Sequence, residues 1–196
     1  MNLGVALSGR AASGKSTLAR EIVNELAKHG RAATILSFAD EIKREVLELY
    51  GIRKSDRGGR EELIRHGERR RLQDPLYWPR RMAPALERAL ERREVPVVDD
   101  LRFRAEASWL GGRGFYLVRV DTPAPLRAAR LECRGEDPAF AYTTNASEAQ
   151  LDRWHGFHRY VRTSRDGRSL LSALPALVLS APGSKKGDAG ASPIQV

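Results

Sequence analysis

The chain has 196 residues, 41% hydrophobic and 30% charged, which fits one soluble globular domain and excludes a disordered chain. No apolar run approaches the roughly 20 residues that cross a bilayer, and the glycine-broken start MNLGVALSGR is too short for a signal peptide, so we expect cytoplasmic residence. The single cysteine, Cys133, excludes an intrachain disulfide framework. The net charge of +9, with only six lysines among 34 basic residues, favours polyanionic partners, although codon bias of a GC-rich genome is an alternative explanation.

A strand–helix–strand unit opens the chain. Residues 3–8 predict a buried parallel strand, residues 16–29 a helix with apolar positions every four residues, and residues 33–38 a second strand. Such a unit implies a parallel sheet with a right-handed crossover. A helix is predicted next, from an N-cap at Asp40 to a C-cap at Gly51.

The middle of the chain is rich in arginine. Residues 52–81 hold nine arginines and few aliphatic side chains, so they predict short helices and loops at the surface. A helix is predicted over residues 82–93, with Pro84 disturbing its first turn, and a short strand over residues 95–98.

The remaining elements continue the alternation of strands and helices. They are helices at 105–110, 123–134 and 169–179 and strands at 115–120 and 157–161, with no clear period at 135–150. The pattern predicts a doubly wound α/β fold, with a five-stranded parallel sheet between two layers of helices. We place one domain at residues 1–180 and, from its linker composition, a disordered tail at residues 181–196.

The turn after the first strand fits the phosphate-binding pattern G-x-x-x-x-G-K-[ST] in full. Backbone N–H groups of such a loop, and the positive end of the following helix, bind phosphate oxygens. Lys15 is expected to reach the β- and γ-phosphates, and the Ser16 hydroxyl to take a place on Mg²⁺. The predicted ATP-binding residues are Gly9, Arg10, Ala11, Ala12, Ser13, Gly14, Lys15, Ser16 and Thr17. The loop alone does not separate a kinase from an ATPase, a GTPase or a motor protein.

Two carboxylates end the third predicted strand. Ligands of open α/β sheets bind at the carboxyl ends of strands, so an aspartate there can hold magnesium-bound water or orient an acceptor phosphate. We assign both the catalytic and the metal role to Asp100, with Asp99 as its competitor, and expect Arg102 to clamp the acceptor phosphate. The alternative is a strand-to-turn corner with solvated charges.

Arginines also recur in the helix predicted after the fourth core strand. Arg127, Arg130 and Arg134 are three and four residues apart, which places them on one helical face. We predict that Arg127 and Arg130 belong to a catalytic lid over the phosphates, with an ordinary solvated face as the alternative.

The segment at 60–81 offers arginines and an aromatic pair for an acceptor pocket. A basic surface and a nucleic-acid contact are the alternatives. Phe38 and Trp78 also fit a hydrophobic core, which is the commoner place for an isolated aromatic side chain. His66, His155 and His158 do not form a metal site, and the 155/158 pair is interpreted as structural.

Several segments together resemble the phage-type deoxynucleoside monophosphate kinases, a branch of the P-loop monophosphate kinases. They are LSGRAASGKSTLA, SFADEIK at 37–43, RHGERRRLQDPLYW at 65–78, VVDDLRF with Glu106 at 97–106, SEAQLD at 147–152 and RTSRDGRSLLSAL at 162–174. The resemblance spans roughly residues 1–180, in the order and spacing of that family. One departure is that Gly67-Glu68 stands where such proteins often have Gly-Thr-Glu.

The resemblance implies the three-layer α/β/α fold of the P-loop NTPases, with mobile lid and acceptor-binding segments. It also implies a set of substrate contacts. These are Ser37, Phe38, Ala39, Arg44, Arg65, Gly67, Glu68, Arg70, Trp78, Arg102 and Phe103, with the turn at 163–167 near the donor adenine. It implies ATP- and Mg²⁺-dependent phosphorylation of deoxynucleoside monophosphates, in the host cytoplasm if the protein is phage-encoded. We expect no stable nucleic-acid partner and no membrane association, and a homodimer is left open. The alternatives are a kinase of another small phosphorylated substrate, such as phosphomevalonate, or an ATPase acting on nucleic acid.

Overall fold

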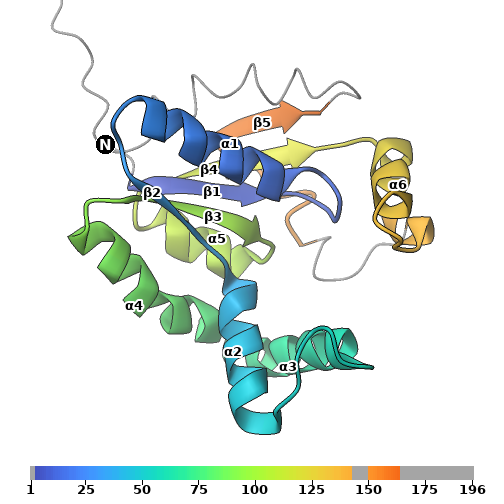
Figure 1. Cartoon of the computed structure of the whole chain (residues 1–196). Coiled ribbons are helices and arrows are strands. Elements are labelled where there is room, and N and C mark those ends of the chain that lie inside the picture. The colour runs from blue at the N-terminus through green and yellow to red at the C-terminus, as the bar shows by residue number, and fades with distance from the viewer. Residues whose placement is uncertain (1–2, 143–149, 164–196) are drawn as a thin grey trace, which may run out of the picture.

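The fold is built on five parallel strands. In the computed structural model, which describes residues 3–142 and 150–163, the strands are β1 (Gly4–Ser8), β2 (Ala33–Leu36), β3 (Val95–Leu101), β4 (Phe115–Asp121) and β5 (Arg159–Arg162). They pair in the order β2-β3-β1-β4-β5 (Figure 1). The predicted sheet is therefore confirmed, whereas the predicted helix at 169–179 and the tail at 181–196 lie outside the described residues.

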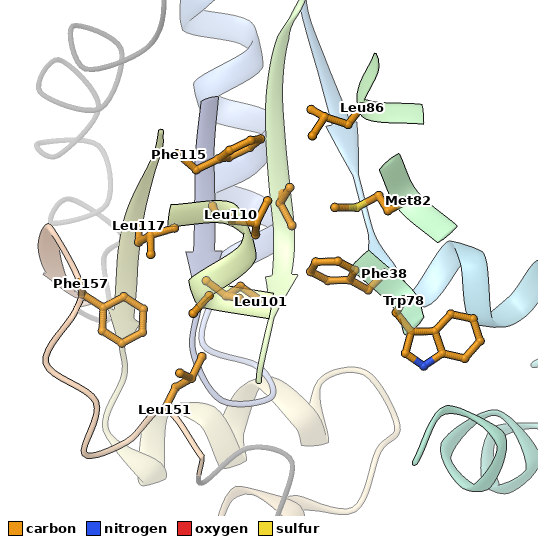
Figure 2. Close-up of a cluster of buried hydrophobic side chains, with 13 residues drawn as sticks. Phe38, Trp78, Met82, Leu86, Leu101, Leu110, Phe115, Leu117, Leu151 and Phe157 are labelled. Carbon is orange, nitrogen blue, oxygen red and sulfur yellow. The ribbon is translucent and has the colours of Figure 1, made fainter. Parts of the chain in front are cut away.

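Helices cover both faces of the sheet. The helix α1 (Lys15–Lys28) packs Leu18, Ile22 and Leu26 against Val5 and Val97 in one buried cluster. On the other face, α4 (Tyr77–Glu91) and α5 (Arg104–Gly111) pack against a second cluster, in which Phe38, Trp78 and Met82 lie together (Figure 2). Because apolar side chains of β1 and β3 alternate between the two clusters, the sheet is buried on both faces, as expected for parallel strands.

Two helices stand away from the sheet beside the second layer (Figure 1). They are α2 (Phe38–Tyr50) and α3 (Gly59–Gln73), and α4 follows after a short turn. The prediction of short helices and loops over residues 52–81 is thus wrong for most of that segment. The periodicity was uninformative because the buried residues of α3 are two glycines and the fully buried His66, with no aliphatic side chain among them.

A buried carboxylate explains how an arginine-rich helix packs. Glu45 of α2 accepts hydrogen bonds from His66 Nε2 at 2.9 Å, Arg70 Nε at 2.7 Å and Tyr77 Oη at 2.7 Å. Burial alone would raise the pKa of Glu45, but these hydrogen bonds together hold it below its usual value. The Arg69 guanidinium donates a hydrogen bond to His66 Nδ1. The imidazole therefore carries its proton on Nε2, and this N–H donates the hydrogen bond to Glu45. This network fastens α3 to α2 and α4.

The carboxyl-terminal elements are α6 (Ala124–Glu132), the short 3₁₀ turn η1 (Pro138–Ala141) and β5. Helix α6 confirms the helix predicted at 123–134. It begins one residue later than predicted because Pro123 is its N-cap. His158 accepts a hydrogen bond from the Leu117 amide at 2.9 Å and stacks on Tyr116, so its structural assignment is also confirmed. Among the residues that the structure describes, no helix is long and apolar enough to span a membrane.

Candidate active site

The loop between β1 and α1 has the form of a phosphate-binding cradle. A Cβ at Gly9 (φ 153°) would lie 2.4 Å from the Val120 carbonyl oxygen, so only glycine fits there. The Ser13 Oγ is buried and has no hydrogen-bond partner among the described residues. Helix α1 has neither a side-chain cap nor an acidic residue in its first turn, which leaves its positive end available to an anion. A phosphate group fits these features.

Lys15 is held at the mouth of this loop. Its ammonium Nζ donates hydrogen bonds to the carbonyl oxygens of Gly9, at 2.6 Å, and Arg10, at 2.9 Å. The side chain is buried, so its charge is poorly screened by water. Lys15 therefore lies where the sequence pattern requires it.

The carboxylate beside the loop serine is Asp99. Its Oδ2 accepts a hydrogen bond from Ser16 Oγ at 2.7 Å, and burial raises the pKa of this carboxyl group above its usual value. A hydroxyl and a carboxylate at this distance are hard oxygen ligands of the kind Mg²⁺ prefers. Ser16 and Asp99 thus fit a magnesium ion that also contacts phosphates.

Asp100 has a different place, which corrects its predicted position at the metal. Its carboxylate accepts hydrogen bonds from Ser37 Oγ at 2.8 Å and from the backbone amides of Phe38, at 2.9 Å, and Ala39, at 2.8 Å. Both aspartates lie on β3, where successive side chains point to opposite faces. Asp99 therefore faces the phosphate-binding loop, while Asp100 holds the start of α2.

The raised pKa of Asp99 predicts a pH effect on magnesium binding. Protons and Mg²⁺ compete for this carboxylate, so the magnesium-dependent affinity for AMPPNP should fall as pH decreases through the raised pKa. The Asp99→Asn variant should bind AMPPNP more weakly and without that pH dependence. Calorimetric titrations between about pH 5 and 8, with and without Mg²⁺, measure both. A variant that keeps the wild-type pH profile would remove Asp99 from the metal site.

A cavity of about 290 Å³ opens on the Asp100 side. Its charged lining is mostly basic, with five cationic residues and two carboxylates, and its remaining lining is apolar. The lining residues are Lys43, Lys54, Arg60, Arg71, Arg102, Glu68, Asp100, Ala39, Ile42, Leu63, Ile64 and Phe103. A second hollow of about 400 Å³ shares Glu68, Arg71 and Phe103 with it. The cavity suits a small anionic molecule.

Arg71 belongs to the arginine-rich segment at 60–81 that was offered for an acceptor pocket, but it was not among the predicted substrate contacts. Its guanidinium donates to the buried Glu106 Oε1 at 3.0 Å and stacks 4.0 Å from the centroid of the Phe103 ring. The Oε2 atom of Glu106 accepts the backbone amides of Arg102 and Phe103, each at 3.1 Å. One buried carboxylate thus fixes three residues of the cavity wall. Lys43 also lines the cavity and was not predicted. The sequence did contain a signal for it, because Lys43 lies one helical turn after the predicted contact Ala39.

The structure brings only part of the predicted acceptor set to this cavity. Ala39, Glu68, Arg102 and Phe103 line it. Phe38 and Trp78 belong to the hydrophobic core instead, with Trp78 Nε1 donating to the Gly67 carbonyl at 3.1 Å (Figure 2). Three predicted arginines are engaged elsewhere: Arg44 pairs with Glu41, Arg65 with Glu62 and Arg70 with Glu45. Ser37 does not line the cavity, but its hydroxyl donates a hydrogen bond to Asp100, which does.

The two arginines predicted for the lid have different environments. Arg127 is buried and donates to the carbonyl oxygens of Thr122, at 3.2 Å, and Ala141, at 2.5 Å, so it joins α6 to η1. Arg130 donates to the Ala12 carbonyl of the phosphate-binding loop at 3.1 Å. Burial, followed by the nearby charge of Arg134, lowers the pKa of Arg130. Arg130 fits the predicted role at the donor phosphates, and Arg127 is structural.

This difference predicts unequal effects on stability. Arg127→Ala removes hydrogen bonds from two buried carbonyl groups and should lower the free energy of unfolding by about 1–3 kcal/mol. That corresponds to about 5 °C in melting temperature for a domain of this size. Thermal unfolding measures it, with Arg134→Ala, which lies two residues after the end of α6 and is exposed, as the control. Equal melting temperatures for wild type and Arg127→Ala would contradict the structural assignment.

Comparisons with known proteins find the same fold in several kinases and a sequence match over the first part of the chain. A family model described as adenylylsulphate kinase matches residues 1–70. The structure of TT1252 from Thermus thermophilus is similar at 21% identity and a TM-score of 0.57, covering 90% of this chain and 96% of that one. The APS kinase CysC of Mycobacterium tuberculosis, in complex with AMPPNP and APS, is similar at 16% identity and a TM-score of 0.53, covering 90% and 99%. A gluconokinase from Sinorhizobium meliloti 1021 is similar at 18% identity and a TM-score of 0.51, covering 89% and 93%. No protein of curated function matches the sequence.

The chain has the fold of the P-loop kinases, with a phosphate-binding loop after β1 and a basic cavity on the other side of β3. The predicted turn at 163–167 near the donor adenine lies outside the described residues, apart from Thr163.

Proposed function

We propose that this protein is a kinase that transfers the γ-phosphoryl group of ATP to a deoxynucleoside monophosphate. The observation that carries the proposal is the pair of neighbouring carboxylates at the end of β3. Asp99 contacts Ser16 of the phosphate-binding loop, and Asp100 lines the basic cavity. A donor site and an acceptor site therefore share one edge of the sheet, as in-line transfer requires.

The chemistry follows from the residues at that edge. An acceptor phosphate oxygen forms a bond to the γ-phosphorus while the bond from that phosphorus to the β,γ-bridging oxygen breaks, and ADP leaves with the electron pair. Lys15 and Arg130 supply positive charge where the equatorial oxygens gain negative charge. When bound by Ser16 and Asp99, Mg²⁺ supplies charge neutralisation at the β- and γ-oxygens.

The cavity favours a phosphate acceptor over a neutral one. Five cations and two carboxylates line it, and this net positive charge suits a phosphate group, whereas a neutral hydroxyl does not need it. A hydroxyl acceptor also needs a general base, but Asp100 already accepts three hydrogen bonds from the start of α2. An acceptor phosphate is already ionised near neutral pH and needs no base. Together with the resemblance, this supports a monophosphate.

Adenylylsulphate is the second candidate. The family model that matches residues 1–70 favours it, and it too is an anionic nucleotide. An ATPase acting on nucleic acid is less well supported, because Arg70 is paired with the buried Glu45 rather than directed toward a backbone of phosphates.

A panel of acceptors tests the proposal. The purified protein is mixed with ATP, Mg²⁺ and each deoxynucleoside monophosphate, with adenylylsulphate, gluconate and phosphomevalonate as comparisons, and ADP release is followed. We expect ADP release that depends on one or more deoxynucleoside monophosphates. Release dependent only on adenylylsulphate would replace the proposed acceptor, and release stimulated only by DNA would indicate an ATPase.

A further inference from the structure

One ion pair joins the wall of the acceptor cavity to the segment that follows α6. Arg60, the second residue of α3, lines the cavity, and its Nη1 lies 3.1 Å from Oε2 of Glu136. Its guanidinium carbon also lies 5.6 Å from the centroid of the Phe140 ring. Glu136 and Phe140 lie after α6 and do not line the cavity. We call Arg60, Glu136 and Phe140 the Arg60 clasp.

The clasp belongs to a continuous set of contacts that reaches the phosphate-binding loop. Phe140 is part of η1, whose Ala141 carbonyl accepts from Arg127 of α6. On the same helix, Arg130 donates to the Ala12 carbonyl of the loop. A ligand that orders the loop therefore acts on the segment that holds Arg60.

The clasp has little value for stability. The side chains of Arg60 and Glu136 are 50% and 32% exposed, and exposed ion pairs contribute little to folding. A free arginine side chain samples many rotamers, whereas the carboxylate and the ring together restrict this one to an orientation at the cavity. The benefit of the contacts therefore lies in preorganisation for an anionic ligand.

We propose that Glu136 and Phe140 are positioning residues that aim Arg60 at the phosphate of the acceptor and couple acceptor binding to nucleotide binding at the loop. The inference rests on the proposed kinase function for the identity of the acceptor, but the coupling itself does not. Because Glu136 and Phe140 act through Arg60, substituting them should no longer change acceptor binding once Arg60 has been removed.

Steady-state kinetics on a mutant cycle test the positioning role. The E136Q/F140A variant should raise KM for the best acceptor about tenfold, leaving kcat within about twofold and the melting temperature unchanged. R60A should raise that KM at least as much, and the triple variant no further than R60A. Lys28→Ala, which removes the exposed Lys28–Glu25 pair on α1, is the matched control and should change nothing. An additive triple variant, or an unchanged KM in E136Q/F140A, would overturn the proposal.

Hydrogen exchange tests the coupling without activity. Saturating AMPPNP and Mg²⁺ should slow exchange of amides 60–66 of α3 severalfold in the wild-type protein and not in E136Q/F140A. Equal slowing in both proteins, or none in the wild type, would overturn the coupling. If no acceptor is phosphorylated by the wild type, the proposed function fails while this experiment still decides the clasp.

Discussion

Replacing Lys15 with alanine is expected to lower kcat at least about a hundredfold, which corresponds to about 3 kcal/mol of transition-state stabilisation. The Lys15 ammonium is buried at the mouth of the phosphate-binding loop, where it donates hydrogen bonds to the carbonyl oxygens of Gly9 and Arg10. At this position its positive charge stabilises the oxygens of a phosphoryl group in transfer. Initial rates at saturating ATP and acceptor measure the effect.

The control for this variant is Lys28→Ala, in the last turn of the same helix, where the lysine is exposed and pairs with Glu25. It should retain wild-type turnover. Circular dichroism and thermal unfolding establish that Lys15→Ala is folded. A folded Lys15→Ala variant with near-normal turnover would contradict the assignment of this loop to catalysis.

The largest effect on stability is expected for Glu106→Ala, which should lower the free energy of unfolding by about 3–5 kcal/mol. Glu106 is fully buried, and the variant would leave the mostly buried Arg71 guanidinium and two backbone amides without their carboxylate. For a domain of this size the melting temperature should drop by about 10 °C. Differential scanning calorimetry measures it.

Glu25→Ala is the matched control, because this glutamate also pairs with basic side chains but is exposed on α1. Its melting temperature should stay within about 2 °C of wild type. The reverse pattern, a stable Glu106→Ala and a destabilised Glu25→Ala, would show that the buried pair with Arg71 does not organise the cavity wall.

Most of the sheet and its order of elements could be predicted from local patterns. The strand at 3–8 and the helix at 16–29 were recognisable because buried parallel strands are continuously apolar and α1 has a one-sided apolar face. Helix α3 could not be predicted in this way. Its buried residues include His66, and its packing depends on the distant Glu45, which no window of sequence around α3 contains.

The donor side of the site was predicted more fully than the acceptor side. The phosphate-binding loop is contiguous, so its pattern specifies both residue types and backbone shape. The distinction between Asp99 and Asp100 depends instead on which face of β3 each occupies, and this is set by the register of the sheet. Arginine spacing likewise could not separate the buried Arg127 from Arg130, because both lie in the same helix and only contacts beyond it differ.

Transfer of label from γ-³²P-ATP tests the central claim most directly. The wild-type protein and Lys15→Ala are incubated with labelled ATP, Mg²⁺ and a mixture of deoxynucleoside monophosphates, and the products are separated by chromatography. We predict that the label appears in a deoxynucleoside diphosphate with the wild-type protein and not with Lys15→Ala. Label recovered only as inorganic phosphate, or a diphosphate formed equally well by the variant, would contradict the account.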